Sequence, residues 1–195
     1  MIKDIQLPEA RLKSEVSVEE ALRLRRSVRS FSDQSLTNEE ISQLLWSAQG
    51  TRMGRQRRTA PSAGALYPLE LYAVMEQGIF HYDPAAHELA AVREGDHRQE
   101  LCRVSLNQEF IIQAPLTVAI TAVYERIAVG YGQERGPRYV HLEVGHAAQN
   151  LALQAVALGL GSVPVGAFDD AAVHRVLGAP QDHEPLYLLP VGHPA

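Results

Sequence analysis

The sequence predicts an α+β fold, and three observations carry that prediction. Helix-capping signals begin at residues 17 and 37. The segment 115–123 is rich in β-branched residues and reads as a buried strand. Helical and strand segments then mix without the regular alternation of a Rossmann domain, which favours α+β over α/β.

The first third of the chain predicts two helices. Ser17 and Glu20 have the spacing of a capping box, and apolar residues follow at helical intervals until an arginine cluster at residues 25–29. Thr37 and Glu40 form a second capping box, and Gly50 ends the apolar helical pattern behind it. Both helices therefore have a predicted start and a predicted end.

Residues 51–59 are polar and rich in arginine, so we expect a mobile loop there. Two interpretations stay open, a solvated basic loop and a flap over the site that follows. Residues 60–68 are mostly small and read as a turn that leads into a strand. The segments 69–75 and 79–82 then predict a hairpin, with residues 76–78 as its turn.

The second half of the chain continues the mixture. We expect a helix at 96–108, a buried strand at 115–123 and a loop or broken helix at 124–137. Residues 139–158 are apolar on most faces, so they predict a central, buried helix that Gly159 caps. Short strands at 163–165 and 186–191 flank a last helix, which Asp169 or Asp170 begins and Gly178 ends.

Length and composition predict one domain over residues 1–195, with an N-terminal extension at 1–16. The formal charge of −5 gives no general attraction to nucleic acid or to an anionic membrane. Cys102 is the single cysteine, so no disulfide can form within the chain. The N-terminus lacks the apolar core of a signal peptide, and no apolar run reaches 18 residues, so we expect a cytoplasmic protein.

Several common chemistries lack their motifs in this sequence. No GxGxxG follows a strand, and no GxxxxGK[ST] is present. Without a GxSxG elbow, Ser62 is a poor candidate for a hydrolase nucleophile. His141 and His146 are five residues apart on one predicted helix and point to different faces, so we expect no metal site.

Two segments together predict a site for a flat, phosphate-bearing cofactor. Arg25, Arg26 and Arg29 surround Ser27, and guanidinium groups bind phosphate oxygens with fixed paired donors. A helix C-terminus also favours cations, so a mere helix cap is the alternative. The second segment contains Pro61, Ser62, Ala63 and Gly64, whose small size lets backbone N–H groups approach a planar ligand.

The order of motifs resembles the nitroreductase-like, FMN-dependent flavin oxidoreductases, and within them the SagB-type dehydrogenases. The resemblance covers nearly the whole chain from about residue 20. Its first motifs are Arg25-Arg26-Ser27-Val28-Arg29-Ser30-Phe31, Leu44-Leu45-Trp46-Ser47-Ala48-Gln49-Gly50 and Pro61-Ser62-Ala63-Gly64-Ala65-Leu66-Tyr67-Pro68. The later ones are Asn107-Gln108 before Ala114-Pro115, Arg138-Tyr139, Glu143-Val144-Gly145-His146-Ala147-Ala148-Gln149-Asn150, Ala157-Leu158-Gly159-Leu160-Gly161-Ser162-Val163-Pro164-Val165-Gly166-Ala167-Phe168-Asp169, and Pro185-Leu186-Tyr187 through Val191-Gly192.

The resemblance implies a central mixed or antiparallel sheet flanked by helices, and FMN held at the interface of a homodimer. It implies that the FMN phosphate is contacted by Arg25, Ser27 and Arg29, with Arg26 beside them. The turn at Pro61, Ser62, Ala63 and Gly64 would meet the flavin, often from the second subunit, and Asn107 would make a polar contact. The ring would pack on the backbone of Pro164, Val165, Gly166 and Ala167.

The expected activity is transfer of electrons from a reduced nicotinamide to a small organic acceptor, with the chemistry done by the flavin. Tyr131 is a candidate acid or orienting group, and its alternative is a loop aromatic at the dimer surface. Azoline-oxidising members carry a lysine where this chain has Gly130, which counts against the rival function of an azoline dehydrogenase. A flavin-binding protein without turnover is the second rival.

Overall fold

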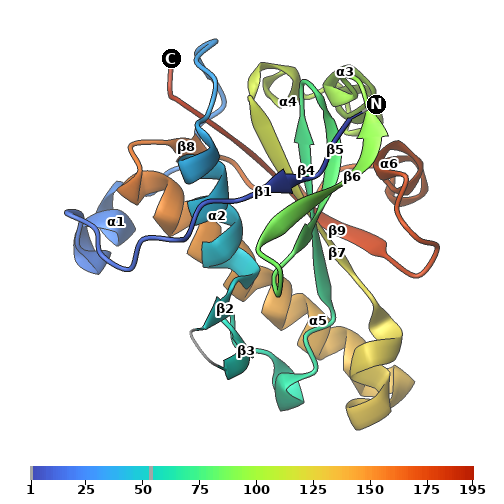
Figure 1. Ribbon diagram of the computed structural model, residues 1–195. Coiled ribbons are helices and arrows are strands. Elements are labelled where there is room, and N and C mark those ends of the chain that lie inside the picture. The colour runs from blue at the N-terminus through green and yellow to red at the C-terminus, as the bar shows by residue number, and fades with distance from the viewer. Residues whose placement is uncertain (1, 53–54) are drawn as a thin grey trace.

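The computed structural model describes residues 2–52 and 55–195, and a seven-stranded sheet forms its centre (Figure 1). Every pair of adjacent strands in this sheet is antiparallel. The strand order is β1-β6-β5-β4-β7-β9-β8. The strands are β1 (Ile5–Gln6), β4 (Leu69–Met75), β5 (Gly78–Asp83), β6 (Glu88–Glu94), β7 (Leu116–Ala122), β8 (Gly161–Ser162) and β9 (Glu184–Gly192). The predicted α+β class is confirmed.

Helices cover both faces of the sheet. One face packs on α2 (Asn38–Gln49) and the long α5 (Tyr124–Ala157), and the other packs on three short helices. Those three are α3 (Arg98–Val104), α4 (Phe110–Gln113) and α6 (Asp170–Leu177). The remaining helices are α1 (Val18–Leu24) and the 3-10 turn η1 (Ala63–Ala65).

The double covering explains the strongly apolar central strands. In β4, Leu71 belongs to the core under α2 and α5, whereas its neighbour Tyr72 belongs to the core under the short helices. Successive side chains of a strand point to opposite faces, so both faces of β4 and β7 are buried. No helix in the described part of the chain is long and apolar enough to cross a membrane.

The predicted helix ends are confirmed where local chemistry sets them. Thr37 and Glu40 form the full capping box: the Thr37 N–H donates to Glu40 Oε2 at 2.7 Å, and the Glu40 N–H donates to Thr37 Oγ1 at 3.2 Å. Ser17 caps α1, which ends at Arg25, and Asp169 caps α6. Gly178 ends α6 in the left-handed conformation, with φ of +63°.

Several elements differ from the predictions. Residues 51–59 contain a short hairpin of β2 (Thr51–Arg52) and β3 (Arg55–Arg58) instead of a loop, while residues 53 and 54 lie outside the described residues. The strand β6 was not predicted. The strand expected at 163–165 is reduced to a bridge between Val165 and Leu188, and β8 lies just before it.

The long helix α5 confirms one prediction and corrects another. It breaks at Gly132, where φ is +73° and ψ is 167°, as expected for a broken helix at 124–137. Its second half is not buried on all sides within one chain. Leu142 is 53% exposed, and Gly145, His146 and Gln149 beside it are also exposed. These four residues face away from the sheet, so this side of α5, with the apolar Leu142 on it, is exposed in the single chain.

Candidate functional site

The arginine cluster lies along the edge strand β8. Ser27 forms a bridge with Ser162, and the Val28 N–H donates to the Ser162 carbonyl at 3.0 Å. Val28 itself is buried, while Arg26 and Arg29 are exposed and Arg25 is half-buried. Within the described chain, no ion pair involves these three arginines. Their guanidinium groups therefore remain available to an external anion.

The segment of Pro164, Val165, Gly166 and Ala167 lies next to this cluster. Val165 is buried and exchanges two backbone hydrogen bonds with Leu188, at 2.8 and 3.0 Å, whereas the other three residues are exposed. These bonds hold the segment as a fixed, exposed stretch of backbone. The Gln108 side chain donates to the Ala167 carbonyl at 3.2 Å, which brings Asn107 to the same region.

The turn at residues 61–64 forms a second group with Tyr131. Gly64 has a left-handed φ of +61°, and a Cβ placed on it would lie 3.4 Å from the Tyr131 hydroxyl. The Tyr131 ring also packs on Tyr139, with 4.4 Å between the ring centroids. The strand β3 borders this turn, because the Arg58 N–H donates to the Tyr67 hydroxyl at 3.3 Å.

One chain does not bring the two groups together. In the described residues, no hydrogen bond or ring contact joins the arginine cluster to the turn at residues 61–64. The turn lies near Glu143 in the middle of α5, whereas β8 follows the C-terminal end of that helix. At a rise of about 1.5 Å per residue, these two positions along α5 are about 20 Å apart. Figure 1 accordingly shows β8 at the upper left and the β2–β3 hairpin well below it.

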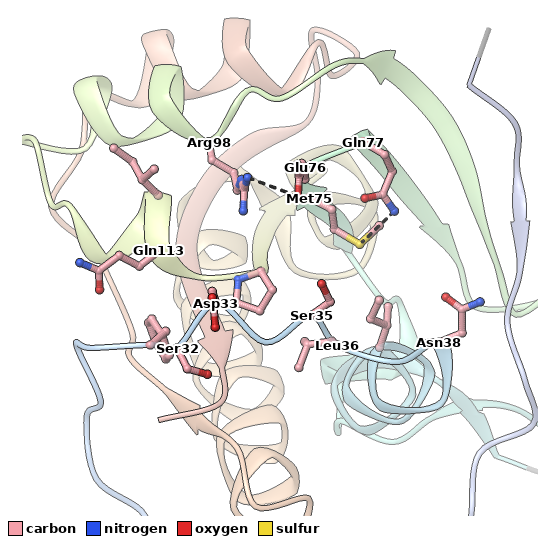
Figure 2. A pocket seen from close by; sticks show the side chains of 14 residues that line it. Ser32, Asp33, Ser35, Leu36, Asn38, Met75, Glu76, Gln77, Arg98 and Gln113 are labelled. Carbon is pink, nitrogen blue, oxygen red and sulfur yellow. Dashed lines mark hydrogen bonds and ion pairs between the residues drawn. The ribbon is translucent and has the colours of Figure 1, made fainter. Parts of the chain in front are cut away.

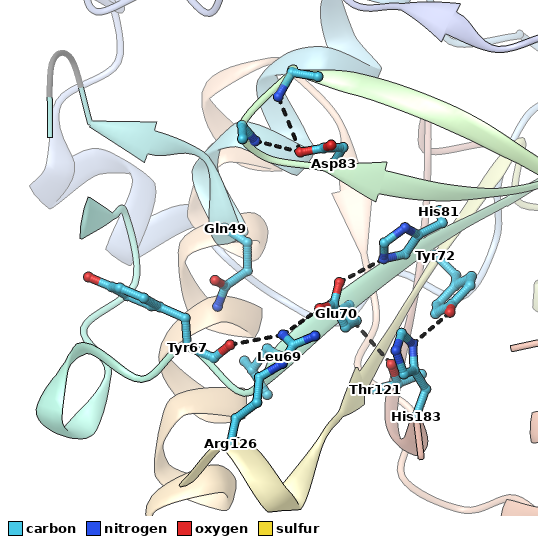
Figure 3. A network of polar contacts seen from close by, with 12 residues as sticks. Gln49, Tyr67, Leu69, Glu70, Tyr72, His81, Asp83, Thr121, Arg126 and His183 are labelled. Atoms are coloured by element: carbon cyan, nitrogen blue, oxygen red, sulfur yellow. Dashed lines mark hydrogen bonds and ion pairs between the residues drawn. The ribbon is translucent and has the colours of Figure 1, made fainter. Parts of the chain in front are cut away.

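Charged side chains hold the end of the turn in place (Figure 3). Tyr67 has a left-handed φ of +47°, which is strained for a residue with a side chain. Arg126 donates to the Tyr67 carbonyl at 3.3 Å and pairs with the buried Glu70. Glu70 also contacts His81 Nε2 at 2.7 Å. Burial raises the pKa of Glu70, but the hydrogen bond with His81 and the charge of Arg126 outweigh burial and lower it to about 2.

Glu143 is a second buried carboxyl and lies beneath the turn. It is 1% exposed, and Gln49 Nε2 donates to its Oε1 at 3.5 Å. Burial raises the pKa of Glu143 to about 7, while Ser62, Gln49 and Arg58 act in the opposite direction. The sequence analysis gave no role to Glu143, Glu70 or Arg126. A glutamate inside an otherwise apolar strand or helix is the sequence signal that could have identified Glu70 and Glu143.

A separate cavity of about 440 Å³ lies between the segment 31–38, α4 and the turn from β4 to β5. Figure 2 shows the side chains that line it. Arg98 reaches it from α3 and pairs with Glu76 at 3.9 Å, as Figure 2 shows, and with Asp96 at 2.7 Å. This cavity contains none of the predicted cofactor-binding residues. A smaller cavity of about 180 Å³, lined in part by Arg26 and Gly161, adjoins the arginine cluster instead.

Comparison with known proteins gives consistent matches. The profile of the nitroreductase family matches residues 22–193. A protein of Methanocaldococcus jannaschii, provisionally named a nitroreductase, is 43% identical over 97% of this chain and 96% of its own length. An FMN reductase (NADPH) of Bacillus subtilis is 29% identical over 87% of this chain and 63% of its own length. The crystal structure of a provisionally named nitroreductase from Ralstonia eutropha has a TM-score of 0.89 and 28% identity, covering all of this chain and 90% of that one.

Proposed function

Because this chain belongs to the nitroreductase family, we propose that it is an FMN-dependent enzyme that passes electrons from a reduced nicotinamide to a small organic acceptor. Family membership makes it a flavin oxidoreductase in general terms. The choice of FMN, of the electron donor and of the acceptor is our proposal. The observation that carries it is the set of guanidinium groups at Arg25, Arg26 and Arg29, which have no ion-pair partner among the described residues, beside the exposed residues Pro164, Gly166 and Ala167.

The donors of the arginine cluster fit a phosphate monoester. Arg25 and Arg29 would bind phosphate oxygens, and the Ser27 hydroxyl would add a neutral donor. The backbone N–H groups of Gly166 and Ala167 would face the ring, because Pro164 has no N–H and the Val165 N–H donates to the Leu188 carbonyl. Asn107 would add a polar contact at the same edge. FMN, when bound, would accept and give up a hydride at N5 of its ring. The protein would bind and orient the donor and the acceptor in turn on the open ring face.

A second copy of the chain completes this arrangement. The turn at residues 61–64 is distant from the arginine cluster within one chain, so we propose that it reaches the flavin of the partner subunit. The exposed apolar residues Val18 and Leu22 of α1 and Leu142 of α5 would form part of the interface. A single domain over residues 1–195 and a cytoplasmic location stay predictions from the sequence.

The test starts with the colour of the purified protein. We expect a yellow protein from which FMN is released, as identified by mass spectrometry. Under anaerobic conditions, NADH or NADPH should reduce the bound flavin and remove its yellow colour. Release of FAD, or no flavin after reconstitution, would contradict the proposed cofactor. A bound FMN that no nicotinamide reduces would favour the flavin-binding protein without turnover.

Gly130 separates this function from azoline oxidation. Proton removal from an azoline ring calls for a base, and glycine at position 130 supplies none. A Cβ at Gly130 would lie 2.9 Å from Leu66 Cδ1, the movable end of a side chain, so a longer residue can be accommodated there. We expect wild type to reduce quinones or nitroaromatics but not to oxidise azoline peptides, and Gly130→Lys to gain azoline turnover. Fast azoline oxidation by wild type would reverse the assignment.

A further inference from the structure

The carboxyl of Glu143 is buried beneath the turn at residues 61–64 without a full set of partners. Among the described residues, one oxygen, Oε1, accepts a long hydrogen bond from Gln49 at 3.5 Å. The other, Oε2, has no hydrogen-bond partner that meets ordinary geometric limits among the described residues. Since buried polar atoms are nearly always paired, this atom calls for an explanation beyond packing.

Ser62 connects this carboxyl to the turn. Its Oγ accepts the Tyr67 N–H at 2.9 Å, which leaves the hydroxyl proton free to point elsewhere. A contact with Ser62 stabilises the ionised form of Glu143 and so lowers the pKa of this carboxyl against the larger effect of burial. Ser62 and Ala63 are half-buried, whereas Pro61 before them and Gly64 after them are exposed. A ligand on the turn would therefore cover Ser62 and place the already buried carboxyl below it farther from water.

The charged groups around Glu143 do not neutralise it. From β3, Arg58 is the nearest positive charge, but its Nη1 donates to Gln49 Oε1 and to the Leu69 carbonyl, both at 3.1 Å. Arg58 is also shared with Glu70 on β4, and Arg126 on α5 opposes its charge. From α2, Gln49 contributes a neutral amide.

We propose that Glu143 is a positioning residue of the flavin-binding turn, whose buried carboxyl takes up a proton from solvent when FMN covers Ser62. This inference rests on the proposed function, because it assumes that FMN binds against residues 61–64. Loss of water from the turn disfavours the charged carboxylate. FMN binding is consequently tightest where Glu143 is already protonated, and it weakens as the pH rises through neutrality.

The direction follows from linkage. A group whose pKa is higher in the complex than in the free protein favours binding fully below its free-state pKa, here about 7. That contribution to binding is lost as the pH rises through the pKa that Glu143 has in the FMN complex. A rise of one unit on binding changes the affinity about tenfold across this range.

The experiment measures the dissociation constant of FMN for the apo-protein by flavin fluorescence, from pH 6 to pH 9. The variants are Glu143→Gln and Ser62→Ala, and the control is Glu125→Gln, an exposed carboxylate on the same helix. We expect the ratio of the wild-type to the Glu143→Gln dissociation constant to rise about tenfold across the range. Titration of the FMN phosphate is common to all variants and cancels in this ratio. Glu125→Gln should follow wild type.

A second readout follows the proton itself. With ¹³C-labelled glutamate, the Glu143 carboxyl resonance of wild type should titrate near pH 7 and move to higher pH after FMN is added. Two results together would overturn this inference and leave the proposed function intact, provided that FMN still binds. The ratio of the dissociation constants would not change with pH, and the Glu143 carboxyl resonance would not move when FMN is added. If FMN fails to bind at every pH, the proposed function falls and this inference with it. The resonance and the Ser62→Ala variant keep the test decisive should Glu143→Gln fail to fold.

Discussion

Two buried glutamates show how neighbouring side chains decide the charge of the same chemical group. Glu70 has Arg126 and His81 as direct partners, so its pKa falls to about 2 in spite of burial. Glu143 has a long contact from Gln49 and a hydroxyl nearby, so burial dominates and its pKa rises to about 7. Both groups lie beneath or beside the turn that ends at Tyr67. The first anchors the turn at every physiological pH, whereas the second changes charge near neutrality.

Glu143→Gln should change how stability depends on pH. The pKa of Glu143 is raised from 4.5 to about 7 on folding, so its stabilising contribution is full below pH 4.5 and is lost as the pH rises through 7. At about 1.4 kcal/mol per unit, the free energy of unfolding of wild type relative to Glu143→Gln should fall by about 3 kcal/mol between pH 4.5 and pH 8. Urea unfolding of both apo-proteins at these two pH values measures the difference. Glu125→Gln is the control. If the free energy of unfolding changes with pH in the same way in Glu143→Gln and Glu125→Gln, the carboxyl of Glu143 is not a buried acid.

Arg25→Ala and Arg29→Ala should each weaken FMN binding. A charge-assisted contact is worth about 1.5–3 kcal/mol, or roughly ten- to a hundredfold in affinity. Arg23→Ala, which removes an exposed arginine from the last turn of α1, is the matched control and should bind FMN as wild type does. Isothermal titration gives the three affinities. Wild-type affinity in both variants, together with a lower melting temperature, would mean that the cluster only caps the helix.

At the scale of elements, β8 is the support of the phosphate-binding segment. It has two residues, pairs with β9 on one side and receives Ser27 and Val28 on the other. The approach is close because residue 161 is glycine: a Cβ there would lie 2.6 Å from Val28 Cβ. No rotamer change relieves that contact, so the backbone of residues 27–29 would have to move.

Gly161→Ala should therefore weaken FMN binding without altering any proposed contact directly. Overpacking of a closely packed position costs about 1–3 kcal/mol, and part of that cost should appear as a displaced arginine cluster. We expect a lower melting temperature for the apo-protein and an FMN affinity reduced at least tenfold. Thermal unfolding and fluorescence titration measure the two effects. An unchanged FMN affinity would show that FMN binding by the arginine cluster does not depend on how residues 27–29 pair with β8.

At the scale of the whole molecule, the chain is expected to act as a homodimer. Light scattering should give twice the 21.5 kDa mass of the chain at micromolar concentration. Leu142→Glu places a charge on the exposed face of α5 and should shift the protein toward monomer and reduce FMN binding in parallel. Val129→Glu is the control, an 88% exposed residue before the break in the same helix. A wild-type monomer that holds FMN would contradict the shared site.

The sequence by itself determined the features that depend on neighbours along the chain. The capping box of Thr37 and Glu40, the cap of α6 and the break of α5 near Gly132 are formed by residues within a few positions of one another. The buried strand β7 was predicted for the same reason, since its β-branched run is a local signal. The candidate residues of the arginine cluster and the turn likewise stood out by residue type.

The tertiary structure alone decided which of these segments meet. β6 has a weak pattern, with several half-buried residues, and becomes a strand because it pairs with β5 and with the two-residue β1. Ser27 lies beside Ser162, and Glu143 lies beneath Ser62, across long stretches of sequence. Such contacts depend on chain topology and on competition among many pairings, which no local pattern encodes. The raised pKa of Glu143 is of this kind, because it arises from burial under segments that only folding brings over it.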